Sequence, residues 1–409
     1  MSSSKNVLFI SYDGLTDPLG QSQILPYLIG LSKKGYDITI LSCEKKHAFL
    51  NYESLIKQQT EVAGIEWMPL QYKSSIPIWS PYLNYKSILK TAKQICKNND
   101  FNLVHCRSIL PAMVGNQLKK QFKLKFLFDI RGFWADERVE GGIWNLRNPI
   151  FKVVYKFFKA QEKLLFRSAD GIITLTQNAK DHILAHFETK RQIDVIPCSV
   201  DVDHFSVRNS SKEKHDELKN SLNITGNHYV LGYIGSLGTR YLLKDMLRFF
   251  SELKKKESKA IFLFVTKTPK DFIINHLNEL GIKTEYVRIT STDYSKMPSY
   301  IHLMHASIFF VSAGFSGKAV SPTKQSEVLS MGKPIIANAG LGDTNILLKE
   351  NNLGVLVPSF TPEKLNSAVK ELLNHNYKPE EIRNAAIRLF SLDEAINNYQ
   401  RMYQKLLGE

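Results

Sequence analysis

Short apolar runs alternate with longer amphipathic segments along almost the whole chain. The runs have the length and apolar content of strands that are buried on both faces of a sheet. Most of the segments between them repeat apolar residues at three- and four-residue spacing, which predicts helices, for example over 23–34, where Gly35 ends the pattern. The expected strands are 6–12, 37–42, 65–70, 103–106, 126–130, 171–175, 193–197, 229–234, 261–265, 285–289, 307–311, 335–337 and 354–357.

This alternation predicts two open, mostly parallel sheets with helices on both faces. A polar stretch over 206–227, rich in Lys, Ser and Asn, separates the two sets of strands. The expected fold class is therefore α/β, with two Rossmann-like doubly wound domains that face each other across a cleft. We expect an N-terminal domain over 1–198, a C-terminal domain over 199–390 and a last helix over 391–409 that returns to the first domain.

The charge of the chain favours an anionic partner. Lys and Arg number 54 against 39 Asp and Glu, a net charge of +15, which suits phosphorylated substrates or an acidic membrane face. The sequence has no Arg/Gly tract or regular basic–aromatic repeat, so we do not expect nucleic acid as a partner. The four cysteines lie far apart without a CxxC pair, which is typical of reduced cytosolic thiols. With no signal peptide and no apolar run of about 18 residues, we expect a cytoplasmic protein, at most peripheral on the inner membrane face.

The segment 321–338 has the most specific local chemistry. Ser321 or Thr323 can cap a helix there, and Pro322 suits its first position. The start of this helix would lie at the carboxyl end of a strand, where doubly wound sheets bind ligands and where free amides suit a phosphate. Glu327 could accept hydrogen bonds from sugar hydroxyls of the same ligand. The segment indicates a site for a nucleotide diphosphate and its ribose; the alternative is a helix cap with a solvated Glu327.

Two glycine-containing loops follow the first strands of the two halves. In the loop 12–22, Gly20 lets the backbone approach a ligand, but the loop matches neither GxGxxG nor a P-loop, and an ordinary turn is the alternative. In 235–244, Arg240 and Lys244 are four residues apart at an expected helix start and would share a face. Two cations there could neutralise a diphosphate leaving group; a solvated pair is the alternative.

Two further segments could serve an acceptor and a membrane. In 128–138, Arg131, Asp136 and Glu137 gather at a strand end beside aromatic residues, which suits an acceptor sugar and a carboxylate that assists proton transfer; a loop with self-paired charges is the alternative. In the helix expected over 149–168, five basic residues recur among apolar ones. Such a helix can lie on anionic lipid, although a core helix with a solvated face is the commoner case.

No motif in the sequence predicts a metal site. Asp201 and Asp203 form a DxD pair, but it lies in the connection between the two halves and has no third carboxylate or histidine pair nearby. The eleven histidines show no HxxxH or HExxH spacing.

Taken together, these motifs resemble a known family. Ser321-Pro-Thr-Lys-x-x-Glu327 with 331–338, the crossover 196–205 and the loop 233–238 resemble the nucleotide-sugar signature of the GT4 family of retaining GT-B glycosyltransferases. The resemblance covers nearly the whole chain. It implies metal-independent transfer, without a cofactor, of a hexose or N-acetylhexosamine from a nucleotide diphosphate sugar, most often a UDP-sugar. The implied acceptor is a glycan or a polyprenyl-diphosphate-linked saccharide of bacterial surface-glycan biosynthesis.

The resemblance also implies roles for individual residues. Glu327 would hold the ribose hydroxyls, the turn 321–324 would meet the diphosphate with its amides, and Gly20 would let its loop close on the donor. The substrate-binding residues expected are Gly20, Gln21, Gly235, Ser321, Pro322, Thr323, Lys324 and Glu327. The catalytic residues expected are Arg131, Asp136, Glu137, Arg240 and Lys244, the last two stabilising the departing diphosphate.

The chain departs from the family pattern at two positions. Ala319 stands where the family has a glutamate, and Arg131 lies where many relatives have a histidine. Two alternatives therefore remain: a nucleotide-sugar epimerase on the same fold, and a catalytically silent scaffold subunit of a glycan-assembly complex.

Overall fold

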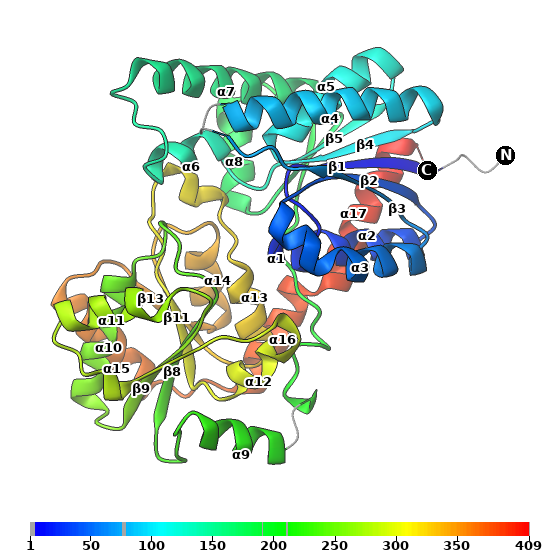
Figure 1. Cartoon of the computed structure of the whole chain (residues 1–409). Helices are drawn as coiled ribbons and strands as arrows, with labels where there is room; N and C mark the ends of the chain where they lie inside the picture. Colours follow the sequence, from blue (N-terminus) through cyan, green and yellow to red (C-terminus); the bar gives the residue numbers. More distant parts are fainter. Residues whose placement is uncertain (1–4, 76–78, 190, 210–211, 409) are drawn as a thin grey trace. The chain divides into compact units, whose positions relative to one another are not determined.

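The computed structural model describes residues 5–75, 79–189, 191–209 and 212–408. It divides into two compact units (Figure 1). Unit 1 comprises Met1–Pro197 and Leu392–Glu409, and unit 2 comprises Cys198–Ser391. The last helix of the chain therefore belongs to the first unit.

Unit 1 is built on a seven-stranded parallel sheet with the order β3-β2-β1-β4-β5-β6-β7. The chain winds in one direction from β1 to β3 and in the other from β4 to β7. In such sheets the crevice at the carboxyl ends of the two strands where the order reverses, here β1 and β4, is the usual place for a ligand. The strands are β1 (Asn6–Ser11), β2 (Asp37–Glu44), β3 (Glu66–Gln71), β4 (Leu103–Arg107), β5 (Lys125–Asp129), β6 (Gly171–Thr174) and β7 (Gln192–Val195).

Helices cover both faces of this sheet (Figure 1). Helices α4, α5 and α7 lie on one face, and α2, α3 and α17 lie on the other. Helix α17 packs against α2 and buries Met402 and Tyr403 there. The helices are α1 (Pro18–Gln23), α2 (Leu25–Lys33), α3 (Lys46–Val62), α4 (Trp79–Asn98), α5 (Ile109–Phe122), α6 (Trp134–Glu140), α7 (Pro149–Ser168), α8 (Gln177–His186) and α17 (Leu392–Leu407).

Unit 2 has a six-stranded parallel sheet with the order β10-β9-β8-β11-β12-β13. The order reverses between β8 and β11. The strands are β8 (Tyr229–Ile234), β9 (Ala260–Val265), β10 (Val287–Thr290), β11 (Ala306–Phe309), β12 (Ile335–Asn338) and β13 (Gly354–Val357). The helices are η1 (Val207–Asn209), α9 (Lys212–Ser221), α10 (Leu243–Lys256), α11 (Lys270–Glu279), η2 (Thr284–Tyr286), η3 (Tyr294–Lys296), α12 (Met297–His302), η4 (Phe315–Ala319), α13 (Thr323–Ser330), α14 (Thr344–Asn351), α15 (Pro362–Asn374) and α16 (Pro379–Phe390).

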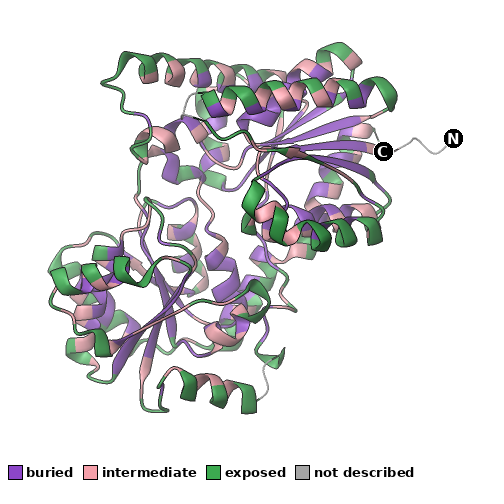
Figure 2. Cartoon of the chain, viewed as in Figure 1, coloured by how far each residue is buried: buried purple, intermediate pink, exposed green. Residues whose placement is uncertain are grey.

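The central strands of both sheets are buried along almost their whole length (Figure 2). Every residue of β9 is buried, including Phe262 and Phe264. Helices on both faces exclude water from these strands, which explains why they are continuous apolar runs rather than alternating ones. The predicted α/β class with two Rossmann-like sheets is confirmed.

The helix predicted over 23–34 is present as α2, Leu25–Lys33, but it begins two residues later than predicted. Gln23 is the last residue of α1, and the two helices are separated at Ile24, whose φ of −128° is not helical. Pro26 lies in the first turn of α2 and has no amide proton to continue a helix from α1. Pattern reading also did not identify α3 and α5.

Candidate functional site

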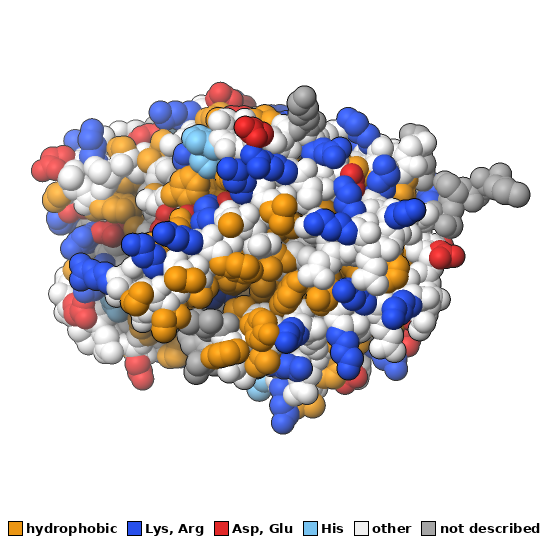
Figure 3. Space-filling model, turned by 90° about the horizontal axis from the view of Figure 1, so that it is seen from above, with side chains coloured by type: hydrophobic (Ala, Val, Ile, Leu, Met, Phe, Trp, Pro, Cys, Tyr) orange, Lys and Arg blue, Asp and Glu red, His pale blue; other side chains and the backbone are white. Residues whose placement is uncertain are grey.

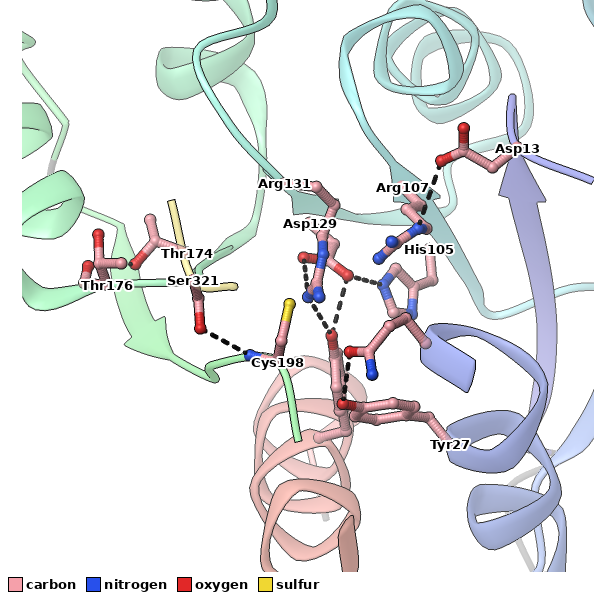
Figure 4. Close-up of polar contacts among 12 residues, drawn as sticks. Asp13, Tyr27, His105, Arg107, Asp129, Arg131, Thr174, Thr176, Cys198 and Ser321 are labelled. Carbon is pink, nitrogen blue, oxygen red and sulfur yellow. Dashed lines mark hydrogen bonds and ion pairs between the residues drawn. The ribbon is translucent and has the colours of Figure 1, made fainter. Parts of the chain in front are cut away.

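The start of α13 lies in the segment singled out from the sequence, but its cap differs from the prediction. Pro322 is the N-cap rather than the first helical residue, and no side chain in the described structure caps the helix. The Ser321 hydroxyl instead accepts a hydrogen bond of 3.2 Å from the amide of Cys198 (Figure 4). The expected capping roles of Ser321 and Thr323 were therefore wrong. The absence of a side-chain cap favours ligand binding, because the backbone amides at the start of α13 can then bind an anion.

Lys324 lies in the first turn of α13 and is buried. Its Nζ donates a hydrogen bond of 2.9 Å to the hydroxyl of Tyr233, at the end of β8. The ammonium also lies 4.1 Å from the centre of the Tyr233 ring and 3.8 Å from that of Tyr241, within cation–π distance. Burial lowers the pKa of Lys324 to about 7, against the opposing charge of Glu327. Lys324 thus places a titratable amine behind the first turn of α13.

Glu327 follows one turn later and is 9 % exposed. Burial raises the pKa of its carboxyl to about 7, and the neighbouring Lys324 counteracts part of that shift. Hydrogen bonds from a pair of hydroxyls would stabilise the charged carboxylate and lower this pKa. A buried carboxylate in this position is therefore suited to binding the diol of a ribose.

The loop after β8 passes next to Lys324. Gly235 has a φ of +92°, a left-handed conformation that glycine adopts without strain. A Cβ atom at Gly235 would lie 3.6 Å from Nζ of Lys324. The structure therefore brings together Gly235, Lys324 and Glu327, which come from two of the segments predicted from the sequence.

Arg240 and Lys244 do not share a helix face as predicted. Helix α10 begins at Leu243, so Arg240 precedes it in the loop. The Arg240 guanidinium donates a hydrogen bond of 3.0 Å to the buried hydroxyl of Ser316 in η4, which follows β11. Lys244 instead pairs at 2.7 Å with Glu279 of α11, and both side chains are 52 % exposed. Arg240 is thus directed toward the strand at which the order reverses, and Lys244 toward the other side of β8.

Two buried polar residues that the sequence reading did not identify hold this site in place. The side-chain amide of Asn338, at the end of β12, bonds both the amide and the carbonyl of Val311. The Thr344 hydroxyl donates to the side-chain oxygen of Gln325 in α13. The first contact joins the ends of the neighbouring strands β11 and β12, and the second holds α13 against the start of α14.

Unit 1 carries a second group of polar residues at the carboxyl ends of β4 and β5 (Figure 4). Asp129 is buried and accepts a hydrogen bond of 2.9 Å from the hydroxyl of Tyr399 in α17. Its carboxylate lies 3.5 Å from Nε2 of His105 and 3.4 Å from the Arg131 guanidinium. Nδ1 of His105 lies 2.7 Å from the hydroxyl of Tyr403. This network holds Arg131 at the end of β5.

The charges within this network stabilise the ionised form of Asp129. Burial alone would raise the pKa of its carboxyl, but Arg131, His105 and Arg107 hold that pKa below the ordinary value. Burial also lowers the pKa of His105, which favours the neutral imidazole. Asp129 is therefore an anion that orients the cation Arg131.

Arg107 and Asp13 lie at the carboxyl ends of the two strands at which the order of unit 1 reverses. Arg107 is the last residue of β4 and is buried, and its Nε lies 3.7 Å from the carboxylate of Asp13, which follows β1. The sequence reading did not select Arg107, His105 or Asp13. These residues could have been found from the polar residues at the end of the apolar strand β4, since strand ends are where such sheets bind ligands.

Asp136 and Glu137 have different surroundings although they are neighbours. The Asp136 carboxylate is buried and accepts hydrogen bonds of 2.8 Å from Tyr155 and from Lys159. It joins α6 to α7, which is the geometry of a structural anchor, and its expected role in the active site remains a prediction. Glu137 is directed at the turn after β5, because a Cβ atom at Gly132 would lie 2.3 Å from its Oε1. That turn also carries Arg131.

Gly20 was predicted in a loop but lies in α1, directly after the loop that follows β1, and this region is held by its own contacts. A Cβ atom at Gly20 would lie 2.0 Å from the carbonyl oxygen of Gly14, so the loop itself requires glycine. The buried carboxylate of Glu44 accepts hydrogen bonds of 2.8 and 3.1 Å from the next two amides, those of Leu15 and Thr16. Gln21 donates to the carbonyl of Thr16. The glycine is thus explained without a ligand, and its predicted role toward the donor remains a prediction.

Comparison with known proteins agrees with this architecture. The family model described as Glycosyltransferase Family 4 matches residues 27–204, and the model described as Glycosyl transferases group 1 matches residues 214–389. An uncharacterized glycosyltransferase of Methanocaldococcus jannaschii is 20% identical over 294 residues, which are 71% of this chain and 71% of that protein.

Solved structures of similar fold cover almost the whole chain. A glycosyltransferase from Rickettsia africae has a TM-score of 0.71 at 17% identity and covers 99% of both chains. HepE from Anabaena, in complex with UDP and glucose, has a TM-score of 0.69 at 14% identity. The match covers 98% of this chain and 100% of the HepE chain. The two family models together span most of both units, and the chain belongs to the GT4-like glycosyltransferases of the GT-B fold.

Proposed function

We propose that this glycosyltransferase is a retaining, metal-independent enzyme that moves a hexose or N-acetylhexosamine from a UDP-sugar. The observation that carries the proposal is the uncapped start of α13 with Lys324 and Glu327 buried behind it. Uncapped amides, one cation and one buried carboxylate match a diphosphate linked to a ribose. The complex of Anabaena HepE with UDP and glucose supports uracil as the base.

The residues of unit 2 would divide the donor between them. The amides at the start of α13 bind the diphosphate, and Glu327 accepts hydrogen bonds from the two ribose hydroxyls. Arg240 stabilises the negative charge that grows on the departing diphosphate. Lys244 would join it after releasing Glu279, which is feasible because an exposed ion pair contributes little to stability.

Transfer would depend on charge placement more than on acid–base chemistry. The bond between the anomeric carbon and the diphosphate oxygen breaks through an oxocarbenium-like state. The acceptor oxygen bonds the same face of the sugar, and its hydroxyl proton passes to the departing diphosphate. A cation that is already in place stabilises the leaving charge without reorganisation, and one such contact contributes about 10²–10³-fold to kcat. Among the described residues, no group of three or more His, Cys, Asp or Glu side chains is placed to hold a metal ion, and the proposed role of Arg240 needs none.

On the acceptor side we assign Arg131, at the turn after β5, and Glu137 of α6, which is directed at that turn, to a glycan or a polyprenyl-diphosphate-linked saccharide. Arg131 is oriented by Asp129 and suits an anionic or hydroxyl-rich acceptor. The proposed setting is bacterial surface-glycan biosynthesis at the anionic inner face of the cytoplasmic membrane. The net charge of +15 fits both the donor and that membrane.

A turnover assay with a panel of UDP-sugars in EDTA tests this proposal. The purified protein is incubated with each sugar, with and without a membrane extract that supplies acceptors. We expect acceptor-dependent release of UDP and a product whose anomeric configuration, determined by NMR, matches that of the donor. Release of UDP with an altered free sugar in the absence of acceptor would indicate an epimerase instead, and neither turnover nor nucleotide binding would indicate a scaffold subunit.

A further inference from the structure

Helix α7 exposes a row of large apolar side chains to solvent. Ile150, Val153, Phe157 and Leu164 are 59, 67, 48 and 42 % exposed. Their spacings of three, four and seven residues place them on one side of the helix. The opposite side of α7 buries Phe158, Leu165 and Phe166 in unit 1, so the exposed row is not needed for packing within the unit. We call these four exposed residues the α7 stripe.

Positive charge lies along the stripe. Lys152, Lys156, Lys163 and Arg167 are all exposed, and their positions in the helix put them along one edge of the stripe. Arg167 is paired at 2.6 Å with Glu188, so the three lysines supply the charge on which the argument rests. The sequence of α7 contains one acidic residue, Glu162, which is buried and paired with Lys159. The solvent-facing side of α7 therefore combines apolar residues with cations and carries no carboxylate.

The start of α4, on the same face of the sheet, repeats this composition. Trp79 and Tyr82 are 54 and 44 % exposed, and Nζ of Lys86 lies 4.8 Å from the centre of the Tyr82 ring. Helix α5 packs against both α4 and α7. Figure 3 looks onto the helices that lie uppermost in Figure 1, and hydrophobic side chains gather along the middle of that view with Lys and Arg around them.

This composition identifies a lipid bilayer rather than a protein as the partner. An amphipathic helix with Lys and Arg beside large apolar residues binds at the boundary between headgroups and acyl chains, and Trp and Tyr are favoured at the same depth. Cations next to the apolar row match anionic headgroups. No helix in the described part of the chain has the length and apolar content needed to cross a membrane.

We propose that the α7 stripe and the start of α4 form a docking surface with which this glycosyltransferase lies on an anionic lipid bilayer. This surface gives the proposed transferase a membrane partner. The purpose of docking rests on the proposed function, whereas binding to lipid does not require transferase activity. The apolar residues insert between the lipids, and the lysines contact the headgroups. A lipid-linked acceptor would then reach unit 1 without leaving the membrane.

Vesicle flotation tests the surface without any sugar donor. The full chain is mixed with vesicles of phosphatidylcholine alone or with phosphatidylglycerol added. We expect binding to the anionic vesicles that weakens with salt, and loss of at least nine-tenths of it in the double variant Val153→Glu, Phe157→Glu. Leu50→Glu is the matched control, because Leu50 is 71 % exposed on α3, on the opposite face of the sheet; it should float like the wild type.

The lysines are tested separately by changing Lys152, Lys156 and Lys163 to Gln. Each cation near an anionic surface contributes about 1 kcal/mol, so partitioning onto anionic vesicles should fall about a hundredfold. A wild type that stays in solution with anionic vesicles would overturn the proposal, as would unchanged binding of the glutamate variant. Self-association that the glutamate variant abolishes, without vesicle binding, would assign the surface to a second copy of the chain. Because no step requires turnover, failure here and failure of the proposed transferase activity are distinguishable.

Discussion

The ammonium of Lys324 donates a hydrogen bond of 2.9 Å to the hydroxyl of Tyr233, which lies at the end of β8. The contact joins the first turn of α13 to the strand at which the order of unit 2 reverses. It also gives a buried cation an acceptor, without which its burial would be unfavourable. The positive charge beside the proposed diphosphate position therefore depends on this tyrosine.

Removal of that hydroxyl should weaken both stability and donor binding. In Tyr233→Phe the buried ammonium loses its acceptor, which costs about 1–3 kcal/mol, and the charged form of Lys324 becomes less favourable. Urea unfolding and the KM for the sugar donor measure the two effects. Tyr241→Phe is the matched control, because Tyr241 presents its ring face to the same ammonium; an equal loss in both variants would contradict the specific role of the Tyr233 hydroxyl.

The pKa of Glu327 predicts a fall of stability with rising pH. Burial raises this pKa from 4.5 to about 7, with Lys324 opposing the shift. Between these values the folded chain binds a proton that the unfolded chain has lost, so the stabilisation present at low pH is lost as the pH rises through about 7. Urea unfolding at pH 5 and pH 7 should show a smaller fall in Glu327→Gln than in the wild type. Identical slopes would contradict the buried environment of Glu327.

Lys324 predicts the opposite slope at higher pH. Burial lowers its pKa from 10.5 to about 7, against the effect of Glu327. Between these values the unfolded chain binds the extra proton, so the free energy of unfolding should rise with pH above about 7. In Lys324→Met this rise should disappear when unfolding is compared at pH 7 and pH 9, and a rise that persists would show that it comes from other groups.

Arg240 and Lys244 should differ in their effect on turnover. Arg240→Gln removes the cation directed at Ser316, so kcat should fall about 10²–10³-fold. Lys244→Gln should lower kcat less than about tenfold, since Lys244 has to leave its pair with Glu279 before it can act. Steady-state kinetics on both variants measures the two effects. A larger loss of kcat in Lys244→Gln than in Arg240→Gln would make Lys244 the main cation at the leaving diphosphate.

Asp136 and Glu137 form a second pair with opposite expectations. Asp136→Asn weakens the contacts with Tyr155 and Lys159, so it should lower the free energy of unfolding by about 1–3 kcal/mol and leave kcat/KM of the folded enzyme little changed. Glu137→Gln should leave stability nearly unchanged and lower kcat/KM. If Asp136→Asn lost activity without losing stability, its carboxylate would belong to the active site after all.

Most of the strands could be predicted because burial on both faces makes them continuous apolar runs, whereas the edge strand β3 has no buried residue. Helix α5 escaped prediction for the same reason: buried residues such as Leu110 and Ala112 lie on nearly opposite sides of it, and no amphipathic period results. The start of α2 after Ile24 could have been predicted from Pro26, because proline is favoured in the first turn of a helix and disfavoured in its interior.

The contacts that decide the roles of side chains could not be predicted, since they join residues far apart in sequence. Ser321 bonds Cys198, and Asp129 bonds Tyr399, across separations of 123 and 270 residues. Neither partner is visible in a local pattern. The residue types at the ends of strands were informative about where the site lies, whereas the assignment of Asp136 as an anchor required the packing of α6 on α7.

The central claim is the nucleotide site at the start of α13, and thermal unfolding with UDP, GDP and ADP in EDTA tests it most directly. A ligand at about 100 times its Kd stabilises a protein by about 2.7 kcal/mol, a readily measured shift. We expect UDP to stabilise the wild type in EDTA, and the shift to be lost in Glu327→Ala, which should remain folded. No stabilisation by any of the three nucleotides, or an equal shift in Glu327→Ala, would contradict the account.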